Sequence, residues 1–149
     1  MLDHAWIAAR VPHQGSMCLL ESVTEWSGQA IVCRARSHRY PDNPLRAEGR
    51  LGAAAGIEYA AQAMAVHGAL LAGDGDRARQ GYLASVRGVS LHASRLDDLP
   101  DDLVIAAERL SGDAGTALYR FELSHRGCCL VAGRAVVVLD AAGVSGPRQ

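Results

Sequence analysis

The sequence predicts an α+β fold in which one long, buried helix is wrapped by an antiparallel sheet. Residues 51–71 form a single helix-favouring run rich in Ala, Leu and Met, and this run is apolar almost all round. A helix without a polar face must be buried on most sides. Strand-like runs stand before and after it, so the elements that bury it are strands. A ferredoxin-like fold is the alternative, but it needs a second long helix, and the sequence has no second run of that kind.

The expected elements follow in order along the chain. Residues 17–26 and 29–37 form a predicted hairpin around the turn Ser27-Gly28. Residues 38–50 are polar and irregular, and a long loop of this kind in a compact domain is often functional. Gly73 ends the helix. Four further strand-like runs, separated by turns, complete the sheet: 79–92, 102–110, 116–125 and 128–139.

Length and composition describe one small domain. The chain has 149 residues, the size of one domain, and we expect residues 1–140 to form it. The Gly-containing residues 141–149 are expected to be a flexible tail. Only 5% of the residues are aromatic, so the core is expected to be aliphatic. With 15 basic and 16 acidic residues, the chain lacks the basic excess of nucleic-acid-binding proteins.

Several classes of segment and site are not expected. The N-terminus lacks the pattern of a signal peptide, and Glu58, Gln62 and His67 interrupt the longest apolar run, so we expect a cytoplasmic protein without membrane contact. The four cysteines lack CxxC spacing, and we interpret them as reduced thiols. The six histidines form no HxxxH or HxH pair, so no metal site is predicted.

Glu58 is the leading candidate for catalysis. It is the only carboxylate in the apolar helical run. An acid in such surroundings is costly unless it is paired, protonated or used. The helix N-terminus favours its charged form while burial opposes it, and a balance of this kind suits a group that transfers protons. The alternative role is that of a first-turn glutamate that caps backbone N–H groups.

Four further residues are weighed beside Glu58. Gln62 lies one turn further on the same helical face, where it can bind Glu58, a substrate carbonyl or backbone groups. Arg50 precedes the helix and can pair with Glu58 or an anionic ligand, or be an ordinary loop residue. His13 sits in a turn, where a structural role is favoured over a catalytic one. His67 is off the face of Glu58 and is not expected to act in catalysis.

Two motifs together resemble one enzyme family. Residues 11–23, Val-Pro-His-Gln-Gly-Ser-Met-Cys-Leu-Leu-Glu-Ser-Val, resemble the opening of 3-hydroxyacyl-acyl carrier protein dehydratases of the hot-dog fold. Residues 56–64, Gly-Ile-Glu-Tyr-Ala-Ala-Gln-Ala-Met, resemble their central-helix motif. The similarity is closest to the dehydratase-like proteins of aryl polyene and related pigment gene clusters, and it covers most of the chain in order.

The resemblance implies a hot-dog dimer with active sites at the interface. It implies that Glu58 is the acid that protonates the leaving 3-hydroxyl, while a histidine of the partner subunit removes the α-proton. It also implies a substrate held as a thioester on the phosphopantetheine of an acyl carrier protein, in fatty-acid or aryl polyene synthesis, with no cofactor of the enzyme's own. Gly56 and Gln62 are the candidate substrate-binding residues.

One position departs from the family pattern. Arg50 occupies the place of the family's histidine, and a guanidinium is a poor base. Three hypotheses follow: His13 or His38 is the base; Glu58 is the base and Arg50 polarises the thioester carbonyl; or the chain is a non-catalytic subunit that binds the carrier and pairs with an active dehydratase. Homodimer and heterodimer both stay open. A thioesterase is a further alternative, because one fold hosts several chemistries.

Arginines are candidates for guiding the carrier protein. Carrier proteins of such systems are acidic, so exposed arginines at the rim of the acyl tunnel are expected to steer them. The candidates lie in and after the second predicted strand: Arg34, Arg36, Arg39 and Arg46.

Overall fold

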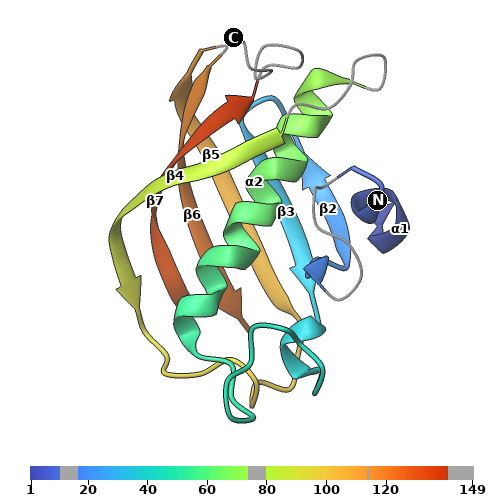
Figure 1. Ribbon diagram of the computed structural model, residues 1–149, viewed down its shortest axis with the longest axis vertical. Helices are drawn as coiled ribbons and strands as arrows, with labels where there is room; N and C mark the ends of the chain where they lie inside the picture. The colour runs from blue at the N-terminus through green and yellow to red at the C-terminus, as the bar shows by residue number, and fades with distance from the viewer. Residues whose placement is uncertain (11–16, 74–79, 114, 141–149) are drawn as a thin grey trace, which may run out of the picture.

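The chain folds as one antiparallel sheet curved around one long helix (Figure 1). The computed structural model describes residues 1–10, 17–73, 80–113 and 115–140. The sheet has seven strands in the order β1-β2-β3-β5-β6-β7-β4, and every neighbouring pair is antiparallel. The elements are β1 (Leu2–Asp3), α1 (His4–Ala8), β2 (Ser22–Trp26), β3 (Ala30–Ala35), η2 (Ser37–Arg39), η3 (Ala53–Ala55), α2 (Gly56–Ala72), β4 (Gln80–Leu91), β5 (Leu103–Gly112), β6 (Thr116–His125) and β7 (Cys128–Asp140).

The predicted α+β architecture is confirmed, and its elements differ mainly at their ends. The helix begins at Gly56 instead of 51, because Leu51 pairs with another loop through its backbone and a 3-10 turn follows. The short elements β1 and α1 were not expected as regular structure. The expected tail, 141–149, lies outside the described residues. Within the described ranges, no helix is long and apolar enough to cross a membrane.

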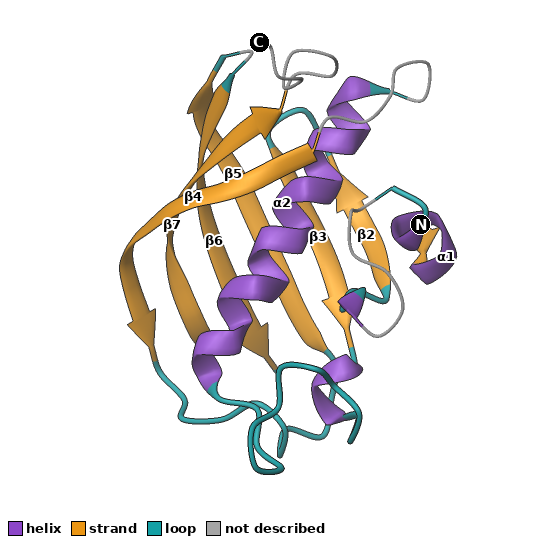
Figure 2. Cartoon of the chain, viewed as in Figure 1, coloured by secondary structure: helices purple, strands orange, loops and turns teal. Residues whose placement is uncertain are grey.

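Helix α2 lies across one face of the sheet and is buried on most sides (Figure 2). Its small side chains, such as Ala60 and Ala63, let the backbone approach the strands closely, and both are fully buried. The larger side chains of Tyr59 and Met64 on the same helix are also buried in the core. The opposing strands contribute an aliphatic surface in which Phe121 is the only Phe of the chain. The expected aliphatic core is therefore observed.

His67 joins the far end of α2 to the sheet through a buried polar network. Its Nε2–H donates to the carbonyl of Ser27 at 2.8 Å, so its Nδ1 accepts the hydroxyl of Tyr119 at 2.6 Å. Burial lowers the pKa of His67 and raises the pKa of Tyr119 to about 12. Both groups are therefore neutral in the folded protein, and His67 has a structural role.

This network predicts that the protein loses stability as the pH falls below about 6.5. The unfolded chain takes up a proton on His67 near the ordinary value of about 6.5, whereas the folded chain resists it. The unfolded state then binds more protons, so the free energy of unfolding decreases with falling pH. Urea unfolding at pH 7.5 and 5.5 measures the effect. The variant His67→Gln keeps one donor and one acceptor without titrating, and we expect a shallower pH dependence. An unchanged slope would contradict this assignment.

Candidate functional site

Glu58 lies in the first turn of α2, where the helix N-terminus approaches the sheet. The residue is half-buried, whereas the sequence placed it in a mostly apolar run and predicted a buried acid. The difference arises because residues 58, 61, 65 and 68 share a stripe of α2 that the sheet leaves partly uncovered. Glu58 thus lies on a partly exposed stripe of α2, in its first turn, where the helix dipole is positive.

Gly56 explains how the first turn of α2 reaches its place. A Cβ at this position would lie 2.9 Å from Leu123 Cδ2 and 3.2 Å from Val131 Cγ2. A larger residue here would have to displace these two side chains, which belong to β6 and β7. Gly56 therefore allows the first turn of α2, which carries Glu58, to pack closely against β6 and β7.

Replacing Gly56 with alanine is expected to displace this turn. The added methyl group must push Leu123 and Val131 aside, and overpacking of this kind costs about 1–3 kcal/mol of unfolding free energy. Chemical denaturation of the variant measures the loss. Gly28→Ala is the matched control, because a Cβ there meets no atom within 4 Å, and its midpoint should stay close to that of the unsubstituted protein. Equal stability of the two variants would show that the close contact is absent.

Gln62 is fully buried and uses both ends of its amide on backbone groups. Its Oε1 accepts the N–H of Leu19 at 2.9 Å, and its Nε2 donates to the carbonyl of Met17 at 2.6 Å. These bonds tie the segment before β2 to the middle of α2. Gln62 thus satisfies backbone groups, which is one of the roles that the sequence left open.

Arg50 stands on a tight turn and is exposed. The backbone N–H groups of Ala47 and Arg50 each donate to the other residue's carbonyl, at 2.8 and 3.0 Å. Glu48 and Gly49 between them have φ values of +53° and +78°, the signature of a type I′ turn. Within the described part of the chain, no ion pair joins Arg50 to Glu58. Arg50 is therefore presented to the outside on a well-defined turn.

Of the two histidines that are candidate bases, His38 is described by the structure and His13 lies outside the described residues. His38 has no exposed surface, and its Nε2–H donates to the carbonyl of Leu99 at 3.1 Å. Burial lowers the pKa of His38, so it is neutral. Although neutrality suits a base, the enclosed ring of His38 has no surface at which a substrate can meet it within this chain.

A buried network missed by the sequence reasoning holds the loop after β3. The hydroxyl of Tyr59, the residue after Glu58, lies 2.8 Å from Ser37 Oγ and accepts Asn43 Nδ2 at 3.1 Å. Asn43 also donates to the carbonyl of Ser37 at 2.9 Å. All three residues are buried. The apolar run gave one signal, because a buried tyrosine hydroxyl needs a partner, but the sequence does not say which residue supplies it.

Asp97 was also missed, and it anchors the chain directly before the site. Its Oδ1 accepts the backbone N–H of Leu51 at 2.9 Å, and Arg95 binds both carboxylate oxygens, at 3.1 and 2.5 Å. The sequence showed only an acidic turn at this place, because the partner Leu51 is 46 residues away.

The arginines proposed to steer a carrier protein are mostly engaged. Arg36 lies 3.7 Å from Glu21, and Arg39 lies 3.6 Å from Asp102. Arg46 donates to two backbone carbonyls, those of Gly49 and His38. Their charges are therefore partly neutralised or used inside the loop. Arg34 borders a surface pocket of about 530 Å³ together with Arg39 and Arg126.

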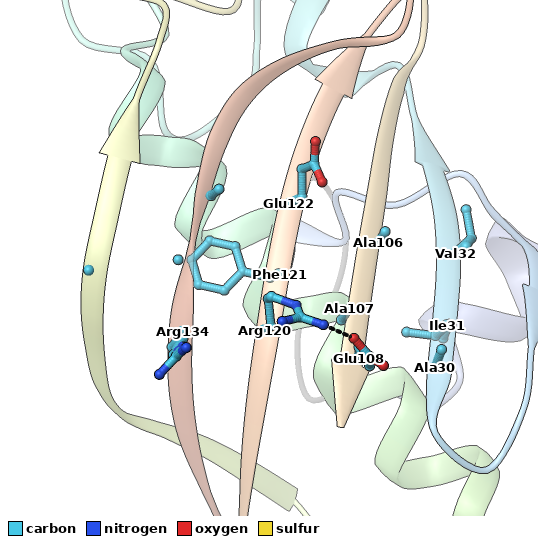
Figure 3. Close-up of a pocket in the computed structure, with 13 residues that line it drawn as sticks. Ala30, Ile31, Val32, Ala106, Ala107, Glu108, Arg120, Phe121, Glu122 and Arg134 are labelled. Atoms are coloured by element: carbon cyan, nitrogen blue, oxygen red, sulfur yellow. Dashed lines mark hydrogen bonds and ion pairs between the residues drawn. The ribbon is translucent and has the colours of Figure 1, made fainter. Parts of the chain in front are cut away.

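A second pocket lies on the opposite face of the sheet from α2 and is unconnected with Glu58. It has a volume of about 430 Å³ and a floor of small side chains, including Ala106 and Ala132. Figure 3 shows Arg120 of β6 facing Glu108 of β5, with Arg134 on the next strand. Glu58 lines neither this pocket nor the one beside Arg34. Within the described residues, no three His, Cys, Asp or Glu side chains gather to hold a metal ion.

Comparison with solved structures defines the class of protein. A chain of the dehydratase heterocomplex ApeI:P from Xenorhabdus doucetiae superposes with a TM-score of 0.77 and 26% identity, over 91% of both chains. A thioesterase of Pseudomonas aeruginosa, PA1618, gives a TM-score of 0.64 with 14% identity over 93% of this chain and 94% of that one. The thioesterase SAV0944 of Staphylococcus aureus gives 0.60 with 14% identity over 80% and 93%. The chain is therefore a hot-dog protein, and the likeness at the higher identity is to a dehydratase.

The family follows from the sequence match. The family model of the ApeP-like proteins, described as ApeP dehydratase, matches residues 5–142. The chain belongs to the ApeP-like dehydratase family, which confirms the resemblance seen in the two motifs. No curated protein sequence matches the chain.

Proposed function

We propose that this protein takes part in the dehydration of 3-hydroxyacyl thioesters carried on the phosphopantetheine of an acyl carrier protein, with Glu58 as the acid. The observation that carries the proposal is the half-buried carboxylate of Glu58 in the first turn of α2, within a chain of a dehydratase family. A base removes the α-proton, Glu58 gives its proton to the 3-hydroxyl, and water leaves as the carbon–carbon double bond forms. Such acid catalysis requires a carboxyl group that substrate can reach.

Neither of the two described residues weighed as a base, Arg50 and His38, suits that role. Arg50 stays protonated at neutral pH, and His38 is enclosed. A second hot-dog subunit that brings a histidine to Glu58 resolves the difficulty, because the family's base comes from the partner. The likeness to a chain of the heterocomplex ApeI:P supports a heteromeric assembly over a homodimer. In this arrangement Glu58 supplies the acid and the partner supplies the base.

The edge strand β4 and the partly exposed stripe of α2 support pairing with another hot-dog subunit. Strand β4 is at the edge of the sheet and has 12 residues, of which Leu83 and Leu91 are exposed to 38% and 50%. A long edge strand with exposed leucines is a template for pairing with another chain. The half-exposed stripe of α2 beside it carries Ala61, Ala65 and Gly68, which leave room for a second helix.

A test compares the protein alone, a candidate second hot-dog subunit alone, and their mixture. Each is incubated with a 3-hydroxyacyl carrier protein, and the carrier-bound product is analysed by mass spectrometry. We expect loss of one water from the acyl group chiefly in the mixture. Release of a free acid would instead identify a thioesterase, the activity of two relatives of the fold. Dehydration by the partner alone at the full rate would identify a non-catalytic binding subunit.

The variant Arg50→His tests whether the missing base explains inactivity of the protein alone. A neutral imidazole accepts a proton at physiological pH, and the family's base acts across the subunit interface. We therefore expect two paired copies of the variant to gain dehydration activity without the second hot-dog subunit. Arg134→His is the control, since Arg134 is exposed and borders the pocket on the face of the sheet opposite α2. Equal activity of both variants and the unsubstituted protein would count against Arg50 as the position of the lost base.

A further inference from the structure

A carboxylate with little exposed surface holds the segment between Arg50 and α2. The side chain of Asp97 is only 7% exposed, although Asp is mostly found at protein surfaces. Arg95 binds it as a fork, with Nε 3.1 Å from Oδ1 and Nη2 2.5 Å from Oδ2. The same Oδ1 accepts the backbone N–H of Leu51 at 2.9 Å. We call these three residues, Leu51, Arg95 and Asp97, the clamp.

The clamp completes a short antiparallel pairing of two loops. The carbonyl of Leu51 accepts the N–H of Leu96 at 2.7 Å, and the N–H of Ala53 donates to the carbonyl of Ser94 at 3.1 Å. The side chains of Leu51 and Leu96 have no exposed surface. The segment that leads into α2 is therefore fixed against the connection between β4 and β5, through both backbone and side chains.

The negative charge of Asp97 strengthens its hydrogen bonds in this pairing. The Arg95 guanidinium and the N–H of Leu51 hold the pKa of the Asp97 carboxyl well below its usual range, so the group is charged at every working pH. A charge-assisted fork fixes geometry as well as adding energy. The fork with Arg95 holds the Asp97 carboxylate in place to accept the N–H of Leu51, the residue immediately after Arg50. On the other side of Arg50 stands the type I′ turn of residues 47–50.

We infer that Asp97 and Arg95 are positioning residues that set the place of the turn 47–50, and hence of Arg50, relative to Glu58 in the first turn of α2. Both site residues are connected through the clamped segment, because Arg50 directly precedes Leu51 and the 3-10 turn η3, which starts at Ala53, leads into α2. The inference rests on the proposed function, in which this end of α2 meets the acyl thioester. In that reaction Arg50 is the group that polarises the thioester carbonyl. The clamp sets the place of Arg50 and touches no substrate itself.

The test uses three variants in the complex with the partner subunit. Asp97→Ala removes the acceptor for Leu51 and the partner of Arg95, and we expect kcat to fall about tenfold or more, because small displacements in a site are costly. Asp97→Asn keeps one acceptor oxygen and should lose less. Asp101→Asn is the matched control, since Asp101 pairs with Arg126 on the surface, and its kcat should be unchanged.

A double variant distinguishes an effect on the position of Arg50 from a general loss of stability. In a protein that already carries Arg50→Ala, adding Asp97→Ala should lower kcat no further, because the clamp acts through Arg50. Hydrogen exchange at the Leu51 amide should be faster in Asp97→Ala while the exchange of β6 stays unchanged. Full activity of Asp97→Ala, or an equal loss in both backgrounds, would overturn the inference. Absence of turnover by the unsubstituted complex contradicts the proposed function instead; faster exchange at Leu51 then still supports the clamp, and unchanged exchange overturns it.

Discussion

Replacing Glu58 with glutamine is expected to lower the rate of dehydration by about 100- to 10,000-fold, the range for loss of a general acid. Glutamine keeps the size of the side chain but cannot give a proton to the leaving hydroxyl. Since Glu58 is half-buried at the start of α2, the fold should tolerate the change, and the thermal midpoint should shift little. The rate is measured with the 3-hydroxyacyl carrier protein and the partner subunit present.

Glu25→Gln is the control for this experiment. Glu25 is an exposed residue of β2, which lies near the opposite end of the sheet from β4, and it has no role in the proposed reaction. Its variant should turn over at the unsubstituted rate. If Glu58→Gln also kept the full rate, the acid would have to be another residue, and the chain would be at most a binding subunit.

Replacing Gln62 with alanine is expected to lower the free energy of unfolding by about 2–6 kcal/mol, because two backbone groups lose their partners at about 1–3 kcal/mol each. The groups are the N–H of Leu19 and the carbonyl of Met17. Urea denaturation measures the change. We also expect the segment 17–21 to exchange its amide hydrogens faster, since the amide of Gln62 is its link to α2.

Gln29→Ala provides the comparison at an exposed position. Its side chain lies in the turn before β3, and such surface changes usually stay within about 0.5 kcal/mol. Gln62→Glu adds a finer test, because it keeps the acceptor for Leu19 but loses the donor to Met17. A loss for Gln62→Ala no larger than that for Gln29→Ala would mean that the two buried bonds do not contribute.

The fold was predictable because its signals are local. The apolar run that became α2, the alternation of β6 and the turns between strands all lie within short windows of sequence. The prediction of β6 matches its observed bounds, Thr116–His125. The helix start was wrong by five residues, since Leu51 prefers a distant backbone partner, Leu96, over helical hydrogen bonds. Propensity alone cannot reveal that competition.

The site was predictable only in part for the same reason. Glu58 stood out because a charge among apolar residues is costly. Its degree of burial depends on which stripe of α2 the sheet covers, and this is a property of the tertiary structure. Asp97 and the network of Tyr59 with Asn43 could not be found, because their partners are distant in sequence. For Gln62, sequence raised the alternatives, and the hydrogen bonds to Met17 and Leu19 distinguish them.

The most direct measurement is a crystal structure of the protein with its partner subunit and a stable 3-hydroxyacyl-pantetheine analogue. We expect the carboxyl of Glu58 to lie within hydrogen-bond reach of the 3-hydroxyl, about 2.6–3.2 Å, with a histidine of the partner facing the α-carbon. An analogue bound elsewhere, with Glu58 turned to solvent and far from the hydroxyl, would contradict it.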